Sequence, residues 1–107
     1  MNIRFSPDSL RIRITKEEAT GLLASGQLQE MIYLPQDQKM LIRLVCNQQQ
    51  SMSCTYKPDL LDVTVDKNTL ERVTRKAPTR ETIDGFYRSF GKHIPVNVEI
   101  DVKMKRS

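Results

Sequence analysis

The sequence has few of the residues from which chemical sites are built. Its 107 residues include no tryptophan, one histidine, two cysteines and four glycines. The glycines are scattered at positions 21, 26, 85 and 91, which excludes a glycine-rich phosphate-binding loop. One histidine and two separated cysteines cannot complete a closed zinc site without carboxylates. We therefore predict no metal, no cofactor and no catalytic residue, so that the protein is not an enzyme.

The cysteine spacing and the lengths of the apolar runs indicate the cellular compartment of the protein. Seven residues separate Cys46 from Cys54, which is too many for a CxxC redox or zinc pair. No apolar run is long enough for the core of a signal peptide or for a membrane span. We expect a cytoplasmic protein that does not contact a membrane, in which both cysteines are reduced thiols.

Charge is plentiful but nearly balanced. The chain has 17 lysines and arginines against 13 aspartates and glutamates, for a net charge of +4. That excess allows a modest attraction for anions and is less concentrated than in a dedicated nucleic-acid binder. The length predicts one domain over residues 1–107, with an aliphatic core because aromatic residues are only 6% of the chain.

The first quarter of the chain carries the clearest structural signals. Residues 3–5 and 10–14 alternate apolar and polar side chains around a Ser-Pro-Asp-Ser turn, which predicts a β-hairpin. Thr15 and Glu18 have the spacing of a capping box, and Gly26 is placed to end the helix that follows. A helix over residues 16–25 is therefore expected.

The remaining elements are read from periodicity. Ile83, Phe86, Tyr87 and Phe90 recur at the spacing of one helix face, and Gly91 would close that helix. The lone histidine, at position 93, would then cap its C-terminus. Other expected elements are strands over 28–34, 40–46, 51–56, 60–65 and 96–104, and a helix over 67–76.

Together these elements predict an α+β fold. We expect a largely antiparallel sheet of about six to seven strands with two to three short helices, because short turns join most neighbouring strands. The expected order is β-β-α-β-β-β-β-α-α-β. No internal repeat is recognised.

Arg4, Arg11 and Arg13 should share the outer face of the first hairpin. A four-residue turn places Arg4 opposite Arg11, and like charges facing each other are unfavourable. Glu99 and Asp101 alternate in the same way on the last strand, so a last strand beside the hairpin would bring carboxylates to the arginines. Two interpretations remain: a solvated face of cross-strand ion pairs, or an anion site built from arginines.

The opening of the chain resembles a family of small uncharacterised bacterial proteins. These begin with an Ile-Arg strand, then a Leu-Arg-Leu-Arg-Leu type of strand, then Ser/Thr-x-x-Glu at the start of a helix. The matching residues here are Ile3, Arg4, Ser9, Leu10, Arg11, Ile12, Arg13, Ile14, Thr15 and Glu18. Residues 79–93 depart from the family pattern. The resemblance implies an order of elements and no activity.

A second basic group lies near the expected helix over 67–76. It comprises Arg72, Arg75, Lys76 and Arg80. The first three fall where positive charge is favourable at a helix C-terminus. As a nucleic-acid site the group lacks interleaved aromatic residues.

Two hypotheses for function follow. The first is a non-catalytic binding or protein-interaction module, with an unknown protein partner or self-association as a homodimer through an exposed strand edge at residues 51–56. The alternative is an anion- or RNA-binding domain that uses either the hairpin arginines or the second basic group. Salt-sensitive binding of nucleic acid would favour the alternative.

Overall fold

The computed structural model describes residues 1–48 and 51–101. Within them the chain forms eight strands and two helices, an α+β fold. The elements are β1 (Asn2–Ser6), β2 (Ser9–Ile14), α1 (Lys16–Ser25), β3 (Gln27–Leu34), β4 (Gln38–Asn47), β5 (Ser53–Lys57), β6 (Leu60–Asp66), α2 (Lys67–Lys76), β7 (Thr82–Ser89) and β8 (Lys92–Ile100). Val102 and Met104, expected in the last strand, lie outside the described residues.

The strands form two sheets instead of the single sheet predicted. Sheet A has the order β1-β2-β8-β7, and sheet B has the order β3-β4-β6-β5. Each sheet consists of two antiparallel hairpins joined by one parallel pair, β2 with β8 and β4 with β6. The prediction of mostly antiparallel pairing is confirmed. The sequence indicated the last strand beside the first hairpin, but not the parallel direction of that pair. The pairing of β4 with β6 was not predicted, because it joins strands from different halves of the chain.

The structure also corrects the view that the chain has no internal repeat. Each half of the chain runs hairpin, helix, hairpin, and each sheet takes one hairpin from each half. The two registers match: Ile12 pairs with Val98 in sheet A, and the equivalent Val63 pairs with Leu44 in sheet B. Residues 7–16 and 58–67, PDSLRIRITK and PDLLDVTVDK, occupy equivalent places. The halves are therefore related by an approximate two-fold axis.

The predicted helix at 83–90 is wrong, because this segment is strand β7. Ile83 and Tyr87 face the interior, whereas Phe86 lies on the outer face opposite Pro95 of β8. Phe90 and Gly91 form the two-residue turn into β8, with φ angles of 51° and 76°. Both angles are positive, as the hairpin turn that matches strand twist requires. The antiparallel ladder to β8 satisfies the backbone groups of β7 that face β8.

Pro95 was expected before the last strand, yet it lies within β8. A proline is disfavoured in an inner strand because it cannot donate a hydrogen bond. Pairing of β8 with β2 begins only at Val96, which pairs with Leu10. The start of β8 consequently has β7 as its one described strand partner, and Pro95 lies before the first residue of β8 that pairs with β2.

The capping box at the start of α1 is confirmed. The Glu18 amide donates to the Thr15 hydroxyl at 3.0 Å, and the Glu18 carboxylate accepts from the Thr15 amide at 2.9 Å. Gly26 ends the helix with a φ of 90°. Burial acts to raise the pKa of the Glu18 carboxyl, but hydrogen bonds from the Met1 amino group at 2.7 Å and from the Thr15 amide outweigh it, so the pKa is lowered.

The capping box makes a testable prediction. We expect Thr15→Ala and Glu18→Ala each to lower the free energy of unfolding by about 0.5–2 kcal/mol. The double variant should lose less than the sum, because either change alone already breaks the reciprocal pair. Urea denaturation measures all three variants. Fully additive losses would show that the two side chains act separately.

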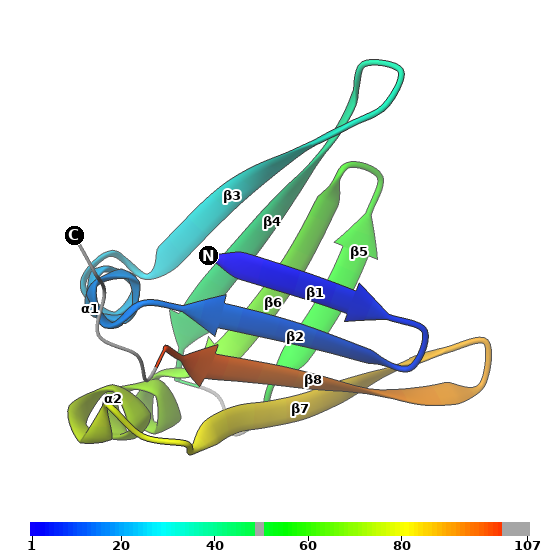
Figure 1. The fold of residues 1–107 in the computed structure, drawn as a ribbon. Coiled ribbons are helices and arrows are strands. Elements are labelled where there is room, and N and C mark those ends of the chain that lie inside the picture. Colours follow the sequence, from blue (N-terminus) through cyan, green and yellow to red (C-terminus); the bar gives the residue numbers. More distant parts are fainter. Residues whose placement is uncertain (49–50, 102–107) are drawn as a thin grey trace.

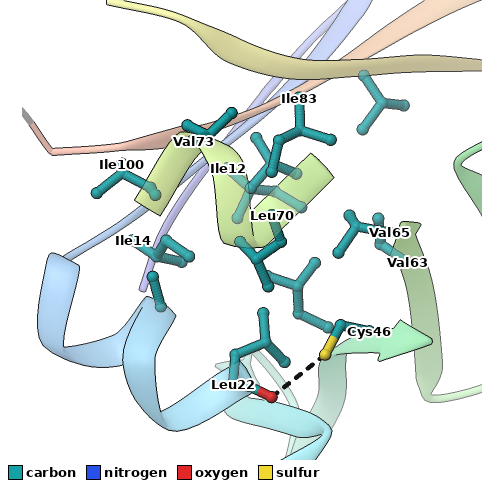
Figure 2. Close-up of a cluster of buried hydrophobic side chains, with 14 of the residues drawn as sticks. Ile12, Ile14, Leu22, Cys46, Val63, Val65, Leu70, Val73, Ile83 and Ile100 are labelled. Atoms are coloured by element: carbon teal, nitrogen blue, oxygen red, sulfur yellow. Dashed lines mark hydrogen bonds between the residues drawn. The ribbon is translucent and has the colours of Figure 1, made fainter. Parts of the chain in front are cut away.

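The molecule is a wedge (Figure 1). Both helices lie at one end, where they cover the closed side of the two sheets, and the strands diverge toward the other end. The inner faces of the sheets and the two helices meet in an aliphatic core, shown in Figure 2. Cys46 lies in this core and donates its thiol hydrogen to the Leu22 carbonyl at 3.3 Å. Neither described helix is long and apolar enough to cross a membrane.

Candidate functional site

The hairpin arginines lie where the sequence predicted. Arg4 pairs in register with Arg11, and the last strand runs beside the hairpin so that Arg13 neighbours Glu99. The Arg13 Nε donates to Glu99 Oε1 at 2.8 Å, and this bond raises the pKa of Arg13. The Asp101 carboxylate adds a smaller effect in the same direction. For Arg13, the interpretation as a cross-strand ion pair is confirmed.

Arg4 and Arg11 differ from Arg13. Within residues 1–48 and 51–101, no carboxylate forms an ion pair with either guanidinium. Together with Asn2 and Arg13 they line a shallow hollow on the outer face of sheet A. Two positive charges thus face each other without a described counter-charge, on an exposed surface.

Most of the second basic group is neutralised locally, by acidic residues of α2 and of the segment that follows it. Arg72 and Lys76 both bond to Glu81, the latter at 3.2 Å, and they lower the pKa of that carboxyl. Arg75 lies 3.5 Å from Glu71, one turn earlier on α2. Arg80, which lies between α2 and β7, is exposed. This group is therefore a set of local ion pairs around the end of α2.

Sheet B provides a contrast for the arginines of sheet A. Its outer face has one arginine, Arg43, which meets Asp62 through two hydrogen bonds of 2.6 and 2.9 Å. This fork-to-fork contact lowers the pKa of Asp62 and raises that of Arg43. The guanidinium of Arg43 is therefore committed to a partner within the fold.

A feature missed in the sequence lies between the sheets, at the open end of the wedge. It is a cleft of about 400 Å³ with residues of both sheets in its wall. The rings of Phe5 and Tyr56 are 54% and 66% exposed at its rim. We call this cavity the cleft. Its lining residues are Phe5, Met40, Cys54, Thr55, Tyr56, Leu61, Tyr87 and Ser89. The sequence did carry a signal, because most of these residues are apolar, alternate with polar neighbours and come from strand ends close to turns.

The two thiols are partly or fully buried, and the histidine lies against an aromatic ring. Both cysteines are free, as expected, and burial raises the pKa of Cys54 in the cleft wall and of Cys46 in the core. His93 was expected to cap a helix, but it lies on β8 and stacks on Phe86 with ring centroids 4.4 Å apart. Among the described residues no group of histidine, cysteine and acidic side chains could hold a metal ion.

Comparison with known proteins defines the family and leaves the activity open. No curated protein and no solved structure matches the chain. A model of a family of unknown function, DUF7009, matches residues 1–104. This agrees with the resemblance to an uncharacterised family that the opening motif indicated. Because the match covers nearly the whole sequence, the chain belongs to the DUF7009 family.

Proposed function

We propose that this protein is a non-catalytic binding module and that the cleft is its binding site. The observation that carries the proposal is the open, largely apolar cavity of about 400 Å³ between two otherwise well-packed sheets. Ligand sites are typically concave and apolar, with a few polar groups that fix orientation. Ser89 supplies such a group here.

The surroundings of the cleft favour a polypeptide partner. Strand β5, which supplies three of the lining residues, lies at the edge of sheet B and pairs with β6 as its one described strand partner. A strand edge can accept a partner strand through backbone hydrogen bonds while alternate side chains enter a pocket. The rim rings of Phe5 and Tyr56 belong to the residue types enriched at protein interfaces. The predicted interaction edge at residues 51–56 thus adjoins the cleft.

A displayed library of random peptides tests the proposal. We expect selection of peptides with a large apolar anchor flanked by residues that favour extended structure. Tyr56→Ser should weaken their binding at least tenfold, because buried aromatic contacts dominate such interfaces. Tyr33→Ser is the matched control, since Tyr33 is 81% exposed and lies on the outer face of sheet B. Isothermal calorimetry measures both variants.

Labelling of Cys54 gives a second readout. Cys54 lines the cleft, whereas Cys46 is buried in the core, so a thiol-specific reagent should react first with Cys54 in the native protein. A bound peptide should slow that reaction, and a bulky label should block the peptide. Peptides that bind equally well to Tyr56→Ser and to the labelled protein would place the site elsewhere and refute the proposal.

Three finer points belong to the same proposal. A second copy of the chain is one polypeptide that could supply the strand at β5, and a concentration-dependent dimer abolished by Tyr56→Ser would identify it. The free thiols of Cys46 and Cys54 favour a reducing compartment such as the cytoplasm. The Leu-Arg-Leu-Arg-Leu type of opening favours a bacterial source.

A further inference from the structure

The outer face of sheet A combines positive charge with an exposed aromatic platform. The strand register defines rows of neighbouring side chains across this face. One row contains Arg4, Arg11, Asn97 and Asp84, and Phe86 lies two residues further along β7. The face is separate from the cleft, which opens between the inner faces of the sheets.

Its guanidiniums are available for an external anion. Arg4, Arg11 and Arg88 form no ion pair with any described residue. The Asp84 carboxylate in the same row accepts hydrogen bonds from Asn97 and Thr82, each at 2.6 Å, and Asn97 lies between it and Arg11. Placing Arg4 directly opposite Arg11 costs stability, since like charges repel across strands. An anion that bridges the two would remove this cost.

The aromatic platform lies on the same face. The rings of Phe86 and His93 are stacked at 4.4 Å with an interplanar angle of 21°. Phe86 is nevertheless 48% exposed, so one flank of this ring pair remains open to solvent. His93 is paired in register with Arg88, which places a cation beside the rings. Two strand spacings separate β2 from β7, or about 10 Å across the sheet.

We propose that the outer face of sheet A binds single-stranded nucleic acid. Arg4 and Arg11 contact the phosphates, and Phe86 offers a surface on which a base stacks. Guanidiniums suit phosphate recognition, and base stacking on aromatic rings together with a basic surface is how proteins hold single strands. RNA and DNA share this chemistry. The proposal does not depend on the cleft, and the peptide experiments leave it untouched.

Two other polyanionic partners fit the face less well. A membrane surface would be expected to meet protruding apolar side chains beside the cations, but Phe86 lies against His93. An acidic protein segment would account for the unpaired arginines but not for the exposed ring of Phe86. The stacked pair is the observation that favours bases.

Fluorescence anisotropy with labelled oligonucleotides tests the proposal on the intact chain. The probes are a twelve-residue oligo(U), the corresponding oligo(dT) and a duplex RNA of the same length. We expect both single strands to bind more tightly than the duplex at low salt. An affinity for oligo(U) above that for oligo(dT) would identify RNA as the preferred source, and the reverse order would identify DNA.

The variants separate charge from stacking. Arg4→Gln/Arg11→Gln should weaken binding at least tenfold at low salt. It should also reduce the slope of log affinity against log salt by about 1.4, because each phosphate contact contributes about 0.7 for a single strand. Phe86→Leu should weaken binding about tenfold and leave the slope unchanged, since stacking releases no counterions. Thermal melts should show that the arginine variant is at least as stable as the parent.

The control removes the same charge from the other sheet. Lys39→Gln/Lys57→Gln acts on the outer face of sheet B and should change affinity less than twofold. Equal losses in both double variants would reveal unspecific attraction and overturn the proposal. Unchanged binding in Phe86→Leu would overturn it too, as would tighter binding to anionic lipid vesicles or to a polyglutamate peptide than to oligo(U).

Discussion

Leu70→Ala is expected to lower the free energy of unfolding by about 3–5 kcal/mol, the upper range for buried leucines. Leu70 is fully buried in α2 and belongs to the core that joins the helices to both sheets (Figure 2). Its equivalent in the other half of the chain is Ala19, also fully buried. The two equivalent positions therefore hold a large and a small side chain, and truncation of the large one leaves a cavity in the buried core.

The matched control for Leu70 is Leu41→Ala. Leu41 is a partly exposed residue on the outer face of sheet B, where solvent can occupy the space. We expect a loss below about 1.5 kcal/mol there, because much of the side chain already contacts water. Urea unfolding followed by circular dichroism measures both variants. Equal losses would mean that the helical end of the wedge is not the stabilising core.

Gly85→Ala is expected to destabilise the protein by about 1–3 kcal/mol through overpacking. A Cβ atom at Gly85 would lie 2.6 Å from the Met52 Cβ and 2.8 Å from its sulfur. Met52 precedes β5, so this contact joins the edge strands β5 and β7 of the two sheets along one side of the wedge. Glycine in a strand usually weakens it, and intrinsic preference alone would predict that alanine stabilises.

The same substitution at Gly21 should have the opposite sign. Gly21 lies in the interior of α1, and a Cβ atom there meets no atom within 4 Å. Gly21→Ala should therefore raise the free energy of unfolding by about 0.5–1 kcal/mol. Met52→Gly should remove most of the cost of Gly85→Ala, because the clash then has no partner. A neutral or stabilising Gly85→Ala would show that the sheets do not approach as described.

Local signals were sufficient for part of the fold and of the candidate sites. The turn at Pro7 and Asp8, the alternation of the first strands and the capping box at Thr15 all act over a few residues. The interactions that these signals depend on are made between residues of the same short segment, so the hairpin and α1 form as predicted. The pairing of Arg4 with Arg11 followed from the length of the turn, which sets the register.

The segment at 83–90 shows where local signals failed. Its apolar spacing fits a helix, and the neighbouring β8 decided otherwise by offering an antiparallel ladder over the whole length of β7. Phe86 and Phe90 then became exposed aromatic residues instead of core residues. Strand preference depends on such partners more than helix preference does, so a single segment cannot reveal it.

By itself the sequence determined the α+β class, the first hairpin, the bounds of both helices, the edge position of β5 and the free state of both cysteines. The alternation of Glu99 with the hairpin arginines indicated the last strand beside the first hairpin. Only the tertiary structure decided that the strands form two sheets and that β4 pairs with β6, a strand from the other half of the chain. The exchange of hairpins between the halves creates the two-fold arrangement, brings Glu99 to Arg13 while leaving Arg4 and Arg11 without a described carboxylate, and opens the cleft. These features depend on contacts between distant segments, which periodicity along the chain does not encode.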